Sequence, residues 1–174
     1  MRRPPRYDLP KAAPGDLRLV QLFVNTTDHE QTRELLETPA DLRTWFAAHG
    51  IETGRVGPAA LGRAHALRDS LRAFAASGSV DGVLRAESEN ARLTVDLERG
   101  RLVASAPGID GAFGGLLAIV YGAVRDGRWA RLKTCRNCGF AYWDASRNRS
   151  AAWCSMQLCG NRLKVRRFRE RQAA

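Results

Sequence analysis

Four cysteines near the end of this 174-residue chain constrain its fold more than any other feature. Cys135 and Cys138 form a Cys-x2-Cys pair, and after fifteen intervening residues Cys154 and Cys159 form a Cys-x4-Cys pair. A tight Cys-x2-Cys turn points both sulfurs the same way, and a second pair beside the start of a helix completes the tetrahedron that Zn²⁺ prefers. The spacing therefore predicts one structural zinc ion per chain, held by four thiolates.

Other uses of these cysteines fit the spacing less well. A single Cys-x2-Cys pair can be redox-active, but two pairs at this spacing favour a structural metal site. Four thiolates leave zinc no open coordination position, so a metal-activated water is not expected. The sequence also contains no nucleophile elbow, phosphate-binding loop or dinucleotide fingerprint. We therefore expect a protein that is not an enzyme.

The basic residues are concentrated in the same part of the chain as the cysteines. Residues 1–127 carry 16 Lys or Arg and 16 Asp or Glu, whereas residues 128–174 carry 12 Lys or Arg and only 2 Asp or Glu. All of the formal net charge of +10 therefore belongs to the second segment. A neutral body with a basic end is typical of a protein that meets a polyanion.

The pattern of apolar residues predicts an α+β fold. We expect a strand at residues 17–24 and helices at residues 38–50, 59–76 and 80–91. A β-hairpin is expected at residues 93–104, followed by a central helix at residues 110–124. That helix should turn five apolar residues inward: Phe113, Leu116, Leu117, Val120 and Val124.

The chain divides into an N-terminal arm at residues 1–16, a mainly helical body at residues 17–127 and a finger at residues 128–174. The arm holds four of the seven prolines, and we expect it to be loosely ordered. The finger should contain a strand at residues 140–143, a polar turn and a terminal helix at residues 163–172, as in a treble-clef-like finger. No apolar leader follows the first residues, and the longest apolar stretch has 13 residues where a membrane span needs about 20. We therefore expect a cytoplasmic protein with no membrane contact.

The cysteine motifs resemble those of the CGNR zinc finger family. The matching stretches are Ser146-Arg147-Asn148-Arg149-Ser150, Trp153-Cys154-Ser155-Met156 and Cys159-Gly160-Asn161-Arg162. That family usually pairs the finger with an N-terminal ABATE domain, whose members are described as candidate stress-induced transcription regulators. The body is similar to this domain at Phe23-Val24-Asn25-Thr26, Pro39-x2-Leu42-x2-Trp45 and Ala64-x2-Leu67-Arg68. Leu22 stands where the family often has an acid, so a ligand-binding role for that acid does not carry over.

The terminal helix is a candidate nucleic-acid surface. Two basic flanks run along it, and two residues of the preceding turn add further positive charge: Arg162, Lys164, Arg166, Arg167, Arg169, Arg147 and Arg149. Arginines on such a helix can contact phosphates and base edges in a groove of double-stranded DNA. Val165 and Phe168 are expected to form the apolar stripe that packs onto the finger.

Other roles for the finger stay open at this stage. Arg136 and Arg162 could neutralise the negative charge of a zinc ion bound by four thiolates, and the basic helix could be a solvated face or a protein-docking surface. Trp143 and Trp153 are expected to shield the metal, with stacking on bases as the alternative. Asn161 is expected to form hydrogen bonds within the finger, with contact to a base as the alternative.

The body has less distinctive features. Asn25 and Thr26 are candidates for a ligand pocket or, alternatively, for a turn at the end of the first element. The resulting hypothesis is a zinc-binding transcription regulator that reads DNA with its finger and uses the body to sense a small-molecule effector or to form a homodimer. The alternative is a structural zinc finger that docks onto proteins, with a body that binds a small molecule.

Overall fold

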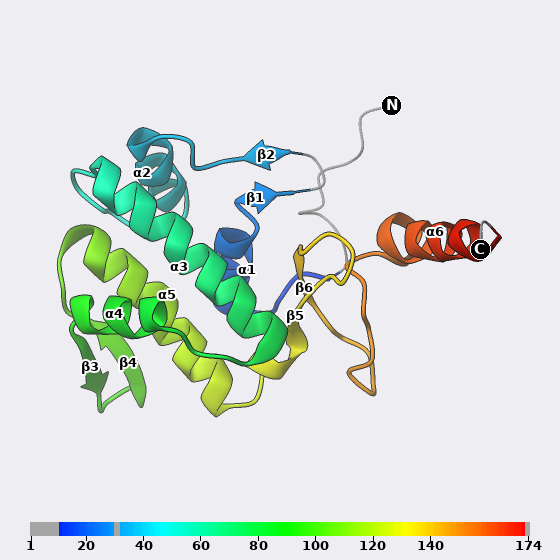
Figure 1. The fold of residues 1–174 in the computed structure, drawn as a ribbon. Helices are drawn as coiled ribbons and strands as arrows, with labels where there is room; N and C mark the ends of the chain where they lie inside the picture. The colour runs from blue at the N-terminus through cyan, green and yellow to red at the C-terminus, as the bar shows by residue number, and fades with distance from the viewer. Residues whose placement is uncertain (1–10, 30–31, 173–174) are drawn as a thin grey trace.

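The computed structural model describes residues 11–29 and 32–172, apart from the side chain of Arg167. Helices dominate the body, and each of the three described sheets is an antiparallel pair of strands (Figure 1). The predicted α+β class is confirmed.

The first element is a helix where the sequence predicted a strand. Helix α1 (Leu17–Val24) buries one face, made by Leu17, Val20, Gln21, Phe23 and Val24. These positions recur at intervals of three and four residues, which is the helical period. A short apolar run fits a buried strand as well as a buried helix, and here packing against the helices α3 and α5 selects the helix. The strand prediction for this segment is wrong.

Capping residues set the limits of the next two helices as predicted. Helix α2 (Pro39–Ala48) begins with a capping box, in which Asp41 N donates to Thr38 Oγ1 at 3.2 Å and Thr38 N donates to Asp41 Oδ2 at 2.8 Å. Helix α3 (Pro58–Ser77) begins with proline at its first position and ends at Gly78, whose φ of 75° is in the left-handed region.

Two hairpins and a short helix flank this helical core. Strands β1 (Thr27–Asp28) and β2 (Arg33–Glu34) follow α1, and helix α4 (Gly82–Asn90) follows α3. Strands β3 (Leu93–Asp96) and β4 (Arg101–Ala104) form the predicted hairpin, with Leu93 opposite Ala104 and Asp96 opposite Arg101.

Helix α5 (Gly108–Arg125) is the centre of the core and contacts α1, α4 and β4. It begins two residues before Asp110, which lies in its first turn. Four of the five residues predicted to point inward are buried: Phe113, Leu116, Leu117 and Val120. Val124 is 47% exposed, because it lies on the open side of the last turn of α5, whose neighbouring residue Ala123 is fully buried. By length and composition alone, α5 is the one helix of the described residues that could cross a membrane, yet in this fold it is the core helix.

The finger follows α5 directly. A turn of 3-10 helix, η2 (Trp129–Arg131), leads into strands β5 (Leu132–Thr134) and β6 (Ala141–Trp143), which pair in antiparallel. A π-helical turn, η3 (Met156–Gly160), then continues into α6 (Asn161–Gln172). Helix α6 packs mainly against η3 and projects away from the body (Figure 1).

The finger hairpin is fused to the body. Leu132 and Ala141 belong to the main hydrophobic core, in contact with elements far away in the sequence. Most of the predicted N-terminal arm lies outside the described residues, but Lys11 and Ala13 contact α1 and β6. Ala13 is 5% exposed and its N–H donates to Gln21 Oε1 at 2.7 Å, while the carbonyl of Lys11 accepts a bond from Trp143 N at 2.9 Å.

Candidate metal centre

The four cysteine sulfurs meet at one point, as the spacing predicted. The Sγ atom of Cys138 lies 3.7 Å from that of Cys154 and 3.6 Å from that of Cys159, and Cys154 and Cys159 are also 3.6 Å apart. All four sulfurs, including that of Cys135, lie within 4.8 Å of one another. A tetrahedral zinc ion with Zn–S bonds of about 2.3 Å separates its sulfurs by roughly 3.8 Å. The cluster therefore has the dimensions of a single zinc site.

Two turns of the backbone build this geometry. In the first, Gly139 N donates to the carbonyl of Cys135 at 2.9 Å, and Cys135 N donates to the carbonyl of Phe140 at 2.9 Å. The turn requires a φ of 70° at Gly139, a conformation that favours glycine. In the second, Ser155 caps η3 by accepting a bond from Leu158 N at 3.2 Å, which places Cys159 beside Cys154.

The cluster is shielded from water. Cys135, Cys154 and Cys159 are at most 3% exposed, and Phe140 and Trp153 pack against them. Trp153 thus occupies the shielding position that the sequence suggested. Trp143 does not, since it packs against the main hydrophobic core of the body. Trp143 lies two residues after Ala141 on β6, and both side chains are on the face of the hairpin that packs against the body.

Electrostatics make the cluster dependent on a cation. Hydrogen bonds from Cys138 and Cys154 hold the pKa of the Cys135 thiol far below its usual value, whereas the same contact with Cys135 raises the pKa of Cys138 to about 12. The pKa of Cys154 is also raised, first by its contact with Cys135 and then by that with Cys138. One thiolate therefore suppresses ionisation of the next, and a divalent cation is what allows all four sulfurs to ionise together.

Asp144 organises the loop between the two cysteine pairs, a role that the sequence reasoning missed. Its side chain is fully buried and accepts bonds from Lys133 Nζ at 2.8 Å, Ser146 N at 2.9 Å and Ala151 N at 3.1 Å. Burial acts to raise the pKa of Asp144, but the bonds from Lys133 and Ser146 outweigh it and lower the pKa below its usual value. The available signal was that Asp144 is one of only two acids in the finger.

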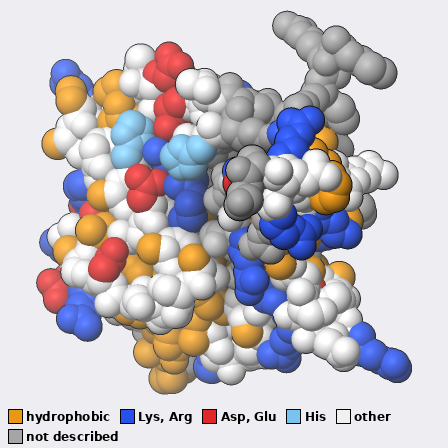
Figure 2. All heavy atoms as spheres, turned by 45° about the vertical axis from the view of Figure 1, so that its right-hand side comes forward, with side chains coloured by type: hydrophobic (Ala, Val, Ile, Leu, Met, Phe, Trp, Pro, Cys, Tyr) orange, Lys and Arg blue, Asp and Glu red, His pale blue; other side chains and the backbone are white. Residues whose placement is uncertain are grey.

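The predicted nucleic-acid residues all belong to the finger, and most of those described are exposed. Arg162 is half-buried at the start of α6, and the side chain of Arg167 lies outside the description. The exposed residues are Arg147, Arg149, Lys164, Arg166 and Arg169. In Figure 2, where the side of the molecule that carries α6 is turned forward, Lys and Arg side chains gather with few acids among them.

The apolar residues of α6 are not packed onto the finger. Val165 is 49% exposed and Phe168 is 55% exposed, so the prediction that they form the packing stripe is wrong. The reason is that α6 contacts mainly η3, the turn directly before it, and projects away from the body (Figure 1). These two side chains lie on a helix that other elements of the described chain leave open.

Asn25 and Thr26 are buried and fully used by hydrogen bonds within the chain. Asn25 Nδ2 donates to the carbonyl of Ala141 at 2.8 Å, and Ala141 N donates back to Asn25 Oδ1 at 2.8 Å. Thr26 Oγ1 donates to the carbonyl of Phe23 at 2.9 Å, which closes the turn after α1. Asn25 therefore joins the body to strand β6 of the finger, and a ligand-binding role for the pair remains a prediction.

In the motif Cys159-Gly160-Asn161-Arg162, close packing explains the glycine. Gly160 is buried, and a Cβ atom there would lie 2.3 Å from Met156 Sδ and 3.3 Å from the Trp153 ring. A larger residue would have to displace the exposed Met156 side chain and would crowd the Trp153 ring, which packs against the sulfur cluster.

Comparison with known proteins agrees with this geometry. No curated protein matches the chain. Residues 131–172 match the CGNR zinc finger family, and residues 17–126 match the ABATE family, which bears the description "Putative stress-induced transcription regulator". The second match spans more than half of the chain. The matches and the clustered cysteines lead to one conclusion: the chain belongs to the ABATE family and ends in a CGNR zinc finger with a single zinc site.

Proposed function

We propose that the chain regulates transcription by contacting double-stranded DNA through the zinc finger and α6, while the body senses an effector or forms a homodimer. The observation that carries this proposal is the placement of α6. The helix projects from the body and holds six basic residues and one acid, Glu170, within residues 161–172 (Figure 1).

The zinc site gives this helix a fixed starting point. Cys159 lies in the turn that leads into α6, so the same ion that closes the finger also orients the helix. A helix of this kind fits the major groove, with arginines on phosphates and base edges. Arg166 Nε lies 3.9 Å from Glu170 Oε1 across one turn, an exposed pair that is weak enough to be exchanged for a phosphate. The proposal implies a cytoplasmic protein that associates with the nucleoid when it binds DNA.

Salt dependence of DNA binding tests the proposal. We expect zinc-loaded protein to bind a fluorescent random-sequence duplex, measured by anisotropy, with an affinity that falls steeply as salt rises. Arg166→Ala combined with Arg169→Ala should weaken binding and reduce the slope of log K against log salt by about 2, since each phosphate contact contributes about 0.9. The matched control is Arg55→Ala, which removes an exposed arginine of the body.

Two outcomes separate the hypotheses. If affinity is unchanged by salt and by the double substitution, direct DNA contact through α6 is ruled out. If the double variant and the Arg55 control lose the same affinity, the binding is a general charge effect. Selection of bound genomic fragments, repeated with Cys154→Ser, then asks whether the zinc-closed finger is needed for sequence preference.

A protein-docking role for α6 is the second candidate, because Val165 and Phe168 are exposed on it. Exposed apolar side chains between basic flanks suit a protein groove as well as they suit DNA. Substituting both residues with Ser separates the two candidates. DNA binding should keep its salt slope in this variant, whereas a docking helix would lose its partner or its self-association.

A further inference from the structure

A cavity of about 610 Å³ lies where the finger meets the body. The C-terminal end of α3 and the end of α5 form one side, and η2, β5 and residues 151–152 of the finger form the other. This volume is within the range of small-molecule sites, which are commonly found between domains. A molecule bound here would contact both halves of the chain.

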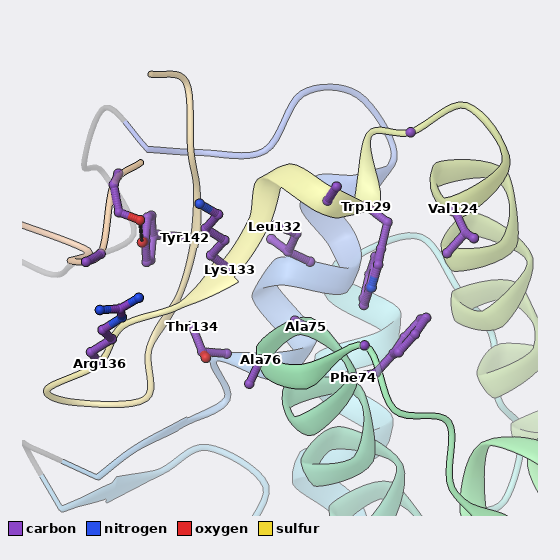
Figure 3. A pocket seen from close by; sticks show the side chains of 15 residues that line it. Phe74, Ala75, Ala76, Val124, Trp129, Leu132, Lys133, Thr134, Arg136 and Tyr142 are labelled. Carbon is purple, nitrogen blue, oxygen red and sulfur yellow. Dashed lines mark hydrogen bonds between the residues drawn. The ribbon is translucent and has the colours of Figure 1, made fainter. Parts of the chain in front are cut away.

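One end of the cavity is aromatic. The rings of Phe74 and Trp129 are stacked, with centroids 5.0 Å apart and an angle of 25° between their planes. Both residues line the cavity, and Val124, which is 47% exposed, completes this apolar end (Figure 3). A flat apolar group could extend this stack and would cover Val124.

Trp129 also carries a polar group that nothing in the described chain satisfies. The residue is 7% exposed, and its indole N–H is buried without a hydrogen-bond partner among the described residues. The N–H itself is covered, so a bound molecule would contact the face of the Trp129 ring, and the N–H group reports on that contact.

The other end of the cavity is positively charged. Arg136 lies at this end, near Tyr142 and away from the aromatic pair in Figure 3. Its side chain is exposed and forms no ion pair with a described residue. The nearby Lys133 is already paired with the buried carboxylate of Asp144 at 2.8 Å. Arg136 is therefore the cation that remains available for an anionic group.

We propose that this cavity binds an arylalkanoic acid, meaning an aromatic ring joined through a short chain to a carboxylate. The ring packs beside Phe74 and Trp129, and the carboxylate pairs with Arg136. The effect of such a ligand on transcription rests on the proposed function, because the ligand would bridge the body and the DNA-contacting finger. Binding itself does not depend on DNA.

Binding can be measured by NMR on zinc-loaded, ¹⁵N-labelled protein without DNA. The four tryptophans give four indole N–H signals, and the Trp129→Phe variant assigns the one from Trp129. The probe is 4-phenylbutyrate, with its neutral amide, 4-phenylbutyramide, as the matched control for charge and hexanoate as the control for the ring. We expect the Trp129 signal to shift as 4-phenylbutyrate is added. The dissociation constant obtained from this shift should be at least tenfold lower for 4-phenylbutyrate than for either control.

Substitution at the charged end gives the second test. Arg136→Gln should weaken 4-phenylbutyrate binding by about tenfold and leave the amide unaffected, since a charged hydrogen bond is lost. Arg55→Gln, in an exposed loop of the body, should change neither. No shift of the Trp129 signal at millimolar probe would overturn the proposal, as would equal binding of acid and amide. Either result would leave the DNA proposal intact, because the assay contains no DNA.

Discussion

Asn25 provides the sharpest test of how the body and the finger are joined. Its side-chain amide makes two buried bonds of 2.8 Å to the backbone of Ala141, one as donor and one as acceptor. In Asn25→Ala the carbonyl of Ala141 keeps its bond from Gln21 Nε2 at 3.1 Å, but the N–H of Ala141 is left buried without a partner. The loss of two hydrogen bonds and the unpaired donor together should lower the free energy of unfolding by about 3 kcal/mol.

This magnitude is easily measured. For a chain of this length, about 3 kcal/mol corresponds to a melting temperature lower by roughly 6–12 °C. Urea denaturation followed by circular dichroism gives the free energy of unfolding, and hydrogen exchange at the amide of Ala141 reports the broken contact directly. The control is Asn90→Ala, at an exposed position at the end of α4, which should stay within about 0.5 kcal/mol of the parent.

The result that would refute this reasoning is also clear. If Asn25→Ala unfolds within about 0.5 kcal/mol of the parent and the amide of Ala141 remains protected, Asn25 does not couple the two parts. The zinc content should be unchanged in this variant, because Asn25 contacts strand β6 and not the sulfurs. Loss of zinc would mean that the body is needed to form the metal site.

The remaining predictions concern the body. Gly114→Ala should destabilise the chain by about 1–3 kcal/mol, because the new Cβ would lie 2.5 and 2.6 Å from two alanine side chains. At Gly115 a Cβ would meet nothing within 4 Å, so Gly115→Ala should stabilise α5 by about 0.5–1 kcal/mol. Both changes can be measured by the same urea denaturation. Asp81→Ala, which removes the cap of α4, should cost about 1 kcal/mol at pH 7. Hydrogen bonds from Ser70 and from Leu84 N lower the pKa of Asp81, and a carboxyl with a lowered pKa stabilises the fold above its unfolded pKa and loses this effect as pH falls. The difference between parent and Asp81→Ala should therefore shrink below about pH 4, and a difference that grows there would contradict this reasoning.

Features that depend on neighbouring residues were predictable from the sequence. The zinc site was predicted residue by residue, because the spacing of Cys135 and Cys138 and of the second pair reflects the turns that present the sulfurs. The limits of α2 and α3 were also predictable, since Thr38 and Gly78 act on the backbone within a few residues.

Features that depend on tertiary packing were not predictable from the sequence. The run at residues 17–24 is short and apolar enough for either a strand or a helix, and only its contacts with α3 and α5 decide. Spacing placed Val165 and Phe168 close together on α6 but could not tell whether another element covers them. The partner of Asn25 lies 116 residues away, so no local pattern could reveal it.

The fused hairpin has a consequence for regulation under the proposed function. Strand β6 is held by Asn25 on the body side, while residues shortly before and after it enter the metal cluster. A change in how the body packs would therefore be transmitted to the finger through β5 and β6 and not through a flexible linker. The cavity beside Trp129 lies at this same junction.

The metal content of the purified protein tests the central claim most directly. Protein prepared without chelator or added metal should contain one zinc ion per chain by elemental mass spectrometry, and Cys154→Ser should lose most of it, together with the helical signal of α6. Protein that contains no zinc, or a Cys154→Ser variant that keeps the full amount, would contradict a site made by these four sulfurs.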